Sequence, residues 1–472
     1  MKIDTIAVHG GYQPDPTTKA VAVPIYQTTS YAFDSTQHGA DLFDLKVQGN
    51  IYTRIMNPTT DVLEKRVAEL EGGVAGLGMA AITAAIMTIV EAGDNIVTSS
   101  ALYGGTYNLF ARTFPQYGIE ARFADYREPK AWERLIDAKT KAVFCESVGS
   151  PLGNVVDFGT LAAIAHARGV PVIVDNTVPT PCLCRPFEHG ADIVVHSLTK
   201  YLGGHGNSIG GAIIDSGNFP WAEHKQKFRR LNEPDVSYRG VVYTEALGLL
   251  HTSAARVVLL RNMGAALSPF NAFLILQGIE TLAVRMDRIC DNALAVAKCL
   301  QNHPKVSWVR YAGLPDHPDK PLVDRYMGGR ASGILSFGIK SGGAGGARFI
   351  DALKLVTRLV NIGDAKRWPV IRRQPRTGSF HRRNWRAPGS VMTWCDCRLA
   401  LSMSTISLPI SSRRCRRLSG GSTLTARSQQ GANLPHQLAR VKWLGNYQLR
   451  TAGQAVLFEC AVMVGGQKYH RH

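Results

Sequence analysis

One short segment, ADIVVHSLTKYLGGHG at residues 191–206, joins a buried-strand pattern to residues that can do covalent chemistry. An apolar run ends at Ser197, and Thr199 and Lys200 follow before a cluster of glycines. A lysine amine that is partly removed from water can form a Schiff base with an aldehyde, and neighbouring hydroxyls can hold a phosphate. The same pattern also fits an ordinary surface lysine after a strand, and this segment alone does not separate the two interpretations.

A carboxylate at the end of a second apolar strand favours the first interpretation. Asp175 closes the strand-like part of PVIVDNT at residues 171–177, where a buried carboxylate needs a cationic partner. A protonated pyridine nitrogen would serve, and its positive charge strengthens the ring as an electron sink. The alternative is an Asx turn or a helix N-cap at the strand end. Asp175 and Lys200, 25 residues apart, together favour pyridoxal phosphate as the cofactor.

The elements that would position these side chains are continuous apolar strands alternating with helices. Such a pattern predicts an α/β protein with a parallel sheet covered on both faces and right-handed crossovers. A second α/β region starts near residue 250. The strand-like segments are 141–148, 171–177, 191–197, 306–312 and 334–340, and the helical ones are 59–71, 158–169 and 288–301.

Four segments together resemble the Cys/Met-metabolism family of pyridoxal-phosphate enzymes. They are IYTRIMNPTTDVLEKRVAELEGG, ALYGGTYNLF, VIVDNTVPTPCLCRPFEHGADIVVHSLTKYLGGHGNSIGGAIID and LSPFNAFLILQGIETLAVRM. The resemblance runs from about residue 3 to Lys366. It implies a fold-type I PLP-dependent transferase, with a large, mostly parallel sheet domain and a smaller C-terminal α/β domain. NEPDVSYRGVVYTEALG, SPFNAF and YAGLPDHP make the chain most similar to the O-acetylhomoserine sulfhydrylase branch.

The resemblance implies a role for each matching residue. Lys200 would bond covalently to the cofactor and later move protons, and Asp175 would pair with the pyridine nitrogen. Ser197 and Thr199 would bind the cofactor's phosphate. Tyr103 would stack on the ring and assist the departure of the leaving group.

Other matching residues concern the phosphate and a neighbouring subunit. Backbone N–H groups of Gly78 and Met79, at a helix start, would bind the phosphate, as such positions suit anions. Tyr52 and Arg54 would reach the phosphate of a neighbouring subunit, so the resemblance implies a homodimer or homotetramer. No metal is expected.

The activity that the resemblance implies is a γ-replacement. The acetate of O-acetylhomoserine would be replaced by sulfide or a thiol such as methanethiol, giving homocysteine or methionine. O-succinylhomoserine sulfhydrylase, cystathionine γ-synthase and methionine γ-lyase share the same cofactor machinery and are the enzymatic alternatives. A non-catalytic protein that keeps the cofactor pocket, or a basic-tailed binding protein, is an alternative of another class.

Two short departures from the family pattern fall near the expected cofactor site. The segment EGGVAGLGMAAITAA is about four residues shorter than the family's stretch. Much of a core strand and the serine before Gly78 are therefore expected to be missing from the phosphate loop. Ser150 stands where the family usually has an asparagine near the cofactor's ring oxygen, so one hydrogen bond there is expected to differ.

The positive charge of the chain is concentrated after residue 366. The net charge is +18, but residues 367–472 hold sixteen Arg, two Lys, one Asp and one Glu, leaving +2 for residues 1–366. A basic tail can bind polyanions. These arginines show no aromatic interleaving and no helical or strand period, so nucleic acid is not expected as a partner.

The tail also lacks the family's remaining motifs, including an arginine for the substrate carboxylate. Back-translating VMTWCDCR at 391–398 and reading from the third base of each codon gives codons compatible with D-M-V-R-L-S, the family's pattern. We therefore interpret the tail as a frameshift product that begins just after Lys366, with the hidden arginine straddling the codons of Cys395 and Asp396. This predicts a poorly ordered tail, a second sheet without its last strand, and weak or no activity. A genuine basic interaction tail is the alternative.

The predicted organisation is an N-terminal arm (1–50), a PLP-binding large domain (51–250), an incomplete small domain (251–366) and the basic tail (367–472). The N-terminus lacks a signal-peptide pattern, and the longest apolar run, 79–90, is too short to span a bilayer. The nine cysteines show neither metal-type spacing nor a disulfide framework. A cytoplasmic protein without a membrane partner is expected.

Overall fold

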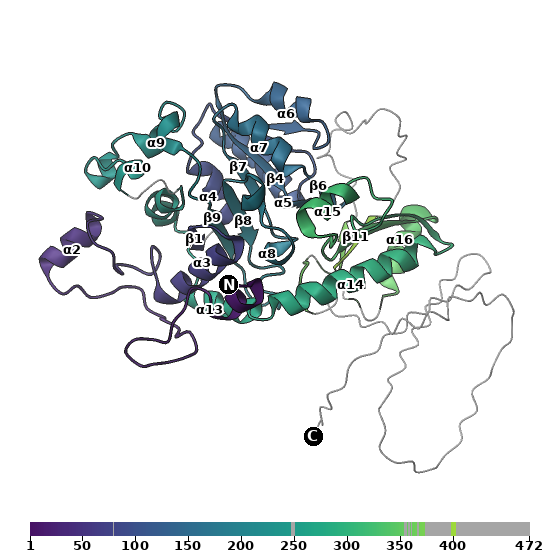
Figure 1. Ribbon diagram of the computed structural model, residues 1–472, viewed down its shortest axis with the longest axis horizontal. Helices are drawn as coiled ribbons and strands as arrows, with labels where there is room; N and C mark the ends of the chain where they lie inside the picture. The colour runs from purple at the N-terminus through teal and green to yellow at the C-terminus, as the bar shows by residue number, and fades with distance from the viewer. Residues whose placement is uncertain are drawn as a thin grey trace, which may run out of the picture.

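A seven-stranded sheet forms the centre of the computed structural model, which describes residues 1–78, 80–246, 251–353, 356, 359 and 361–365, together with the backbone of 368–372 and 398–402. The strand order is β1-β9-β8-β7-β4-β2-β3 (Figure 1). Six strands run in the same direction, and β9, between β1 and β8, runs antiparallel to both of its neighbours. The bounds are β1 (Ala75–Gly78), β2 (Asn95–Ser99), β3 (Glu120–Ala124), β4 (Thr140–Glu146), β7 (Val172–Asp175), β8 (Ile193–Ser197) and β9 (Gly211–Asp215).

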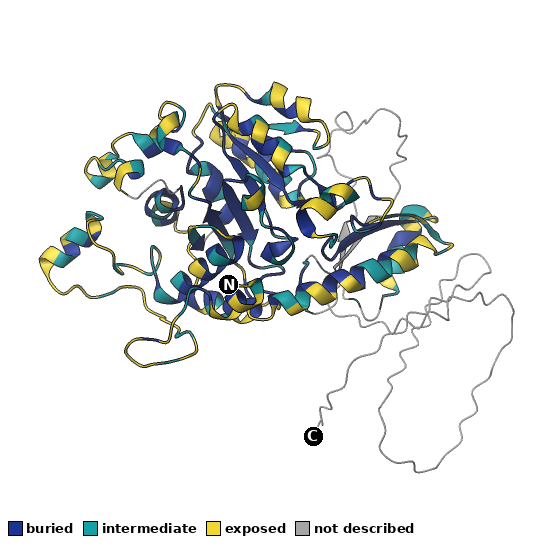
Figure 2. Ribbon diagram, in the orientation of Figure 1, coloured by how far each residue is buried: buried dark blue, intermediate teal, exposed yellow. Residues whose placement is uncertain are grey.

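Both faces of this sheet are buried, as the continuous apolar strands predict. Successive side chains of a strand point to opposite faces. Val172 and Val174 accordingly join a core cluster with α3 (Pro58–Glu71) and α7 (Phe158–His166), whereas Ile173 joins another with α4 (Ala81–Met87). Figure 2 shows the central strands dark blue throughout. The predicted parallel sheet with helices on both faces is confirmed.

Helix α3 lies where the amphipathic pattern predicts it. Its N-cap Asn57 accepts a hydrogen bond from the backbone N–H of Thr59, and Pro58 occupies the first turn, where a missing N–H costs nothing. Gly72 ends the helix at φ +78, a conformation that favours glycine. The predicted inward residues of this helix, Val62, Val67 and Leu70, are all buried.

A smaller sheet follows, in the order β10-β11-β13-β12. It packs against two helices that contact β11, the long α14 and α16 (Figure 1). Two of its strands come from beyond residue 366, so the expectation that this sheet lacks its last strand is wrong; the rest of the predicted tail lies outside the described residues. The bounds are β10 (Val306–Arg310), β11 (Ile334–Ile339), β12 (Trp368–Arg372), β13 (Arg398–Ser402), α14 (Leu282–Gln301), α15 (Lys320–Met327) and α16 (Gly342–Asp351).

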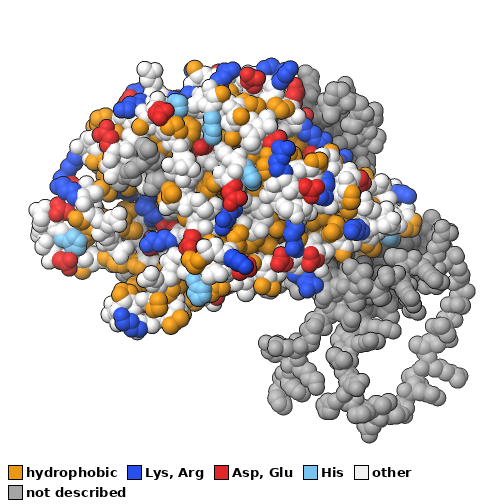
Figure 3. Space-filling view, in the orientation of Figure 1, with side chains coloured by type: hydrophobic (Ala, Val, Ile, Leu, Met, Phe, Trp, Pro, Cys, Tyr) orange, Lys and Arg blue, Asp and Glu red, His pale blue; other side chains and the backbone are white. Residues whose placement is uncertain are grey.

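The N-terminal 50 residues contain two helices within the predicted arm. Helix α1 (Ile3–His9) buries Ile6 and Ala7 against the large unit, whereas α2 (Thr36–Phe43) projects from the body (Figure 1). On the face drawn in Figure 3, basic and acidic side chains are interspersed, as expected for a nearly neutral body. Among the described helices, none is long and apolar enough to cross a membrane.

Candidate active site

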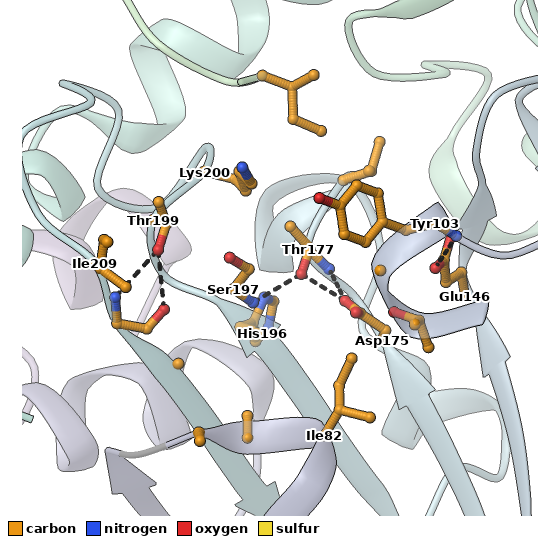
Figure 4. A pocket seen from close by; sticks show the side chains of 18 of the residues that line it. Ile82, Tyr103, Glu146, Asp175, Thr177, His196, Ser197, Thr199, Lys200 and Ile209 are labelled. Carbon is orange, nitrogen blue, oxygen red and sulfur yellow. Dashed lines mark hydrogen bonds between the residues drawn. The ribbon is translucent and has the colours of Figure 1, made fainter. Parts of the chain in front are cut away.

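A cavity of about 620 Å³ lies at the carboxyl ends of three neighbouring parallel strands. In open α/β sheets this edge is the usual place for a ligand. The last residues of β4, β7 and β8, which are Glu146, Asp175 and Ser197, all line it (Figure 4).

Lys200 lies in the turn after β8 and points into this cavity (Figure 4). Its backbone N–H donates to Ser197 O at 3.1 Å, and its carbonyl accepts from Gly204 N at 2.8 Å, which fixes the turn. Burial lowers the pKa of the Lys200 amine, and the charge of Asp364 acts in the opposite direction. A lowered amine pKa is what a Schiff-base lysine needs, because only the neutral amine attacks an aldehyde.

A side chain from the second unit holds the lysine amine. Lys200 Nζ donates to Asn361 Oδ1 at 2.5 Å, and Asn361 Nδ2 donates in turn to Asp364 Oδ2 at 3.1 Å. Both Lys200 and Asn361 line the cavity. The sequence prediction missed Asn361, which lies 161 residues from the lysine and carries no local signal.

Asp175 forms the opposite wall of the site. Its Oδ1 accepts from the N–H of Thr177 at 3.0 Å and from the Thr177 hydroxyl at 2.5 Å. Burial raises the pKa of the carboxyl, and these two hydrogen bonds and the charge of His196 act to lower it. No lysine or arginine in the described part of the chain affects the pKa of Asp175, so the carboxylate could pair with a cation brought by a ligand.

Two hydroxyls border the lysine side of the cavity, and both were predicted. Ser197 lines the cavity, and its N–H donates to Thr177 Oγ1 at 2.8 Å. Thr199 Oγ1 accepts from Gly210 N at 3.1 Å and lies 3.3 Å from Gly210 O (Figure 4). Both hydroxyl groups are therefore placed where a phosphate at this end of the cavity could be held.

Tyr103 lines the cavity just before α5 (Gly104–Asn108). Its N–H donates to Glu146 Oε1 at 2.5 Å, and Glu146 Oε2 accepts from Ser150 N at 3.3 Å. Gly105 leaves room for the ring, because a Cβ there would lie 2.6 Å from a carbon of the Tyr103 ring. Glu146 was not predicted, although it ends a buried strand just as Asp175 does.

The structure differs from the prediction at the expected phosphate loop. The N–H of Gly78 donates to Glu64 Oε1 at 2.8 Å, so it is not offered to a phosphate as expected. Strand β1 is present and pairs over its whole length with β9, which corrects the expectation that much of this strand is missing. Gly78 is the last residue of the strand. The part of this segment that lines the cavity is the four residues 80–83. Met79 lies outside the described residues.

Tyr52 and Arg54 do not line the described cavity. The Arg54 guanidinium lies over the Tyr52 ring, 5.2 Å from its centroid, and Tyr52 is 41% exposed. Their predicted contact is with a neighbouring subunit and stays a prediction.

The residues present fit an aldehyde cofactor with a pyridine ring and a phosphate. The cavity combines a lysine of lowered pKa, a carboxylate with no lysine or arginine partner in the described chain, an aromatic ring and two hydroxyls. Such a cofactor withdraws electrons from a bound amino acid. Fold and cavity together therefore define an enzyme that carries an aldehyde cofactor on a lysine.

Comparisons with known proteins agree with this class. The family model for "Cys/Met metabolism PLP-dependent enzyme" matches residues 4–374. O-acetyl-L-homoserine sulfhydrylase from Leptospira meyeri is 51% identical over 77% of this chain and 85% of its own length. Homocysteine synthase from Schizosaccharomyces pombe is 48% identical over 77% of this chain and 86% of its own length.

A solved structure is similar as well. It is that of a protein assigned as an O-acetylhomoserine (thiol)-lyase from Campylobacter jejuni, and it contains N′-pyridoxyl-lysine-5′-monophosphate. Its TM-score is 0.78 at 35% identity, covering 86% of this chain and 96% of the other. The chain belongs to the Cys/Met-metabolism family of PLP-dependent enzymes. The predicted cofactor, pyridoxal phosphate, and the predicted fold-type I architecture are thereby confirmed.

Proposed function

We propose that this chain catalyses replacement of the acetate of O-acetylhomoserine by sulfide or methanethiol. The bond from the γ-carbon to the acetate oxygen breaks, a bond from the γ-carbon to sulfur forms, and homocysteine or methionine is released with acetate. The observation that carries the proposal is Lys200, held by Asn361 in a cavity opposite Asp175. It is supported by relatives named O-acetyl-L-homoserine sulfhydrylase and homocysteine synthase at 48–51% identity.

The cavity residues divide the work of this reaction. The cofactor supplies the electron sink, and Asp175 would hold its pyridine nitrogen while Ser197 and Thr199 would hold its phosphate. The Lys200 amine would move a proton between neighbouring substrate carbons, because Asn361 holds it inside the cavity. Tyr103 would cover the ring and assist the departure of acetate.

The test is a product assay on the purified chain. O-acetylhomoserine is expected to give homocysteine with sulfide and methionine with methanethiol, each with release of acetate. O-succinylhomoserine, and cysteine in place of sulfide, are the control substrates. Preference for O-succinylhomoserine, or cystathionine as the main product, would contradict the proposed specificity.

We propose further that residues after Lys366 come from a shifted reading frame. The alignments reach 85–86% of the relatives' own length but only 77% of this chain, and the family match ends at residue 374 although the chain continues to 472. The chain would then lack the arginine expected to bind the substrate carboxylate. Cofactor capture is expected to persist, whereas turnover is expected to be weak.

A frame-restored chain is the matched control for this second proposal. Removing the shift after Lys366 should raise turnover strongly, since an arginine–carboxylate pair is not replaceable by Cys395 or Asp396. The visible absorbance of the bound cofactor should be similar in both chains. Full turnover by the unaltered chain, or codons incompatible with the reconstruction, would refute the frameshift.

An oligomer and a cytoplasmic location complete the proposal. Tyr52 and Arg54, outside the described cavity, are available to a neighbouring subunit, which supports a homodimer or homotetramer. Mass measurement of the cofactor-loaded protein tests this. Among the described residues, Cys145, Cys182, Cys184, Cys290 and Cys299 are free thiols, which fits a reducing compartment.

A further inference from the structure

A fully buried pair of ionisable side chains adjoins the cofactor cavity. His196 Nε2 lies 2.5 Å from Glu71 Oε1, and neither side chain is exposed to any extent. Asn176 Nδ2 donates to the same carboxylate oxygen at 2.8 Å. Glu71 is also the last residue of α3, where the helix dipole disfavours a negative charge. A carboxylate in this position needs strong compensation.

Among the described residues that hydrogen-bond to Glu71, His196 can supply a full positive charge. A buried carboxylate is tolerated when it is paired with a cation and hydrogen-bonded. Of the two described side chains that bond to Glu71, the amide of Asn176 is neutral, and His196 can carry a positive charge. Nε2 and Oε1 are 2.5 Å apart, so the two side chains are in direct hydrogen-bond contact.

The pair is fixed against Asp175 by the sheet. Asp175 on β7 lies opposite Val195 on β8, so His196 is the next residue along the neighbouring strand. The Thr177 hydroxyl joins Asp175 to the backbone of Ser197, which follows His196. The charge of His196 lowers the pKa of Asp175, against the effect of burial.

We propose that His196 is an imidazolium, paired with Glu71, that acts as a positioning residue for the cofactor by keeping Asp175 ionised. This inference rests on the proposed role of Asp175 as the partner of the pyridine nitrogen. A neutral His196 would have the opposite effect, because the uncompensated charge of Glu71 would then disfavour a second anion nearby.

The charge of His196 can be measured without cofactor. Long-range ¹H–¹⁵N spectra of the full cofactor-free chain, labelled with ¹⁵N-histidine, should show both ring nitrogens of His196 protonated. In E71Q, which keeps the shape but removes the charge, His196 should become neutral. A neutral His196 in the unmutated chain would overturn the proposal.

Cofactor affinity gives the second readout. Titration with pyridoxal phosphate, followed by the visible absorbance of the bound cofactor, should show a Kd raised about tenfold or more in H196Q and E71Q, since one pKa unit is a tenfold change in ionisation. H166Q is the control, because His166 also pairs with an acidic residue, Asp192 just before β8, but its side chain is 40% exposed and lies outside the cofactor cavity. Its Kd should not change.

The outcomes separate a positioning role from a structural one. Thermal unfolding checks that each variant folds, and E71Q replaces H196Q if the latter does not. An unchanged Kd in a folded variant would overturn the proposal. If the unmutated chain binds no cofactor, the proposed function fails instead, and the spectra of the cofactor-free chain still decide the charge of His196.

Discussion

The hydrogen bond between Asn361 and Lys200 makes a quantitative prediction. In N361A the lysine amine loses the acceptor that lies 2.5 Å from Nζ. A hydrogen bond to a charged group contributes about 1.5–3 kcal/mol, which corresponds to roughly a 10- to 150-fold change in rate. We expect kcat to fall by about this factor while KM for O-acetylhomoserine changes little, because the lysine acts on the bound substrate.

The assay is initial-rate sulfhydrylation in the frame-restored chain, in which turnover is expected to be measurable. N302A is the control, since Asn302 is exposed and the one hydrogen bond that its side chain makes among the described residues is from Nδ2 to Lys298 O. N361D gives a second readout: a carboxylate beside Nζ should raise the pKa of Lys200, so cofactor capture by the neutral amine should need a higher pH. A kcat of N361A near that of the unmutated enzyme, with unshifted capture in N361D, would refute the positioning role.

Three further predictions concern stability and packing. G363A should impair folding and cofactor capture, seen by thermal unfolding and visible absorbance, because Gly363 has φ +83 and a Cβ there would lie 2.5 Å from Tyr201 N; an unchanged midpoint would contradict this. N57A should lower the free energy of unfolding by more than about 1 kcal/mol, measured by urea titration, because Asn57 caps α3 and its buried side chain also donates to Tyr26 O, Tyr31 Oη and Thr53 Oγ1; a loss below this would contradict it. The hydrogen bond to Asp192 raises the pKa of His166 above 6.5, so the pair stabilises the fold fully below pH 6.5 and progressively less as the pH rises through the raised pKa. The difference in free energy of unfolding between the unmutated chain and H166Q should therefore become smaller at higher pH. A difference that grows with pH would contradict this.

The residues that could be predicted from sequence share a local signal. Asp175, Ser197, Thr199 and Lys200 each lie at or just past the end of an apolar strand, and parallel strands bring their carboxyl ends to one edge. The same signal would have found Glu146, which ends β4. The helix and strand positions could be predicted as well, because the apolar periodicity of a segment is also a local signal.

The residues that were missed or misplaced depend on distant contacts. Asn361 reaches Lys200 only because the second unit packs against the turn after β8. Gly78 was misplaced because β1 needs four residues to pair with β9 in a segment that has been shortened, so the glycine belongs to the strand. The carboxylate of Glu64, on α3, accepts the hydrogen bond from the Gly78 N–H. Neither the contact of Asn361 nor the position of Gly78 can be derived from the sequence immediately around the residue.

The contact between residues 361–365 and the lysine turn also sets an order of events during synthesis. Ala365 N donates to Gly204 O at 2.7 Å, and Asn361 holds the Lys200 amine. A nascent chain that has emerged only as far as the large sheet therefore has its lysine but not the residues that hold it. We therefore expect efficient capture of cofactor only after residue 365 has left the ribosome. That point falls just before Lys366, so a chain whose frame shifts there would still complete its cofactor site and would withdraw cofactor from the cell without matching turnover.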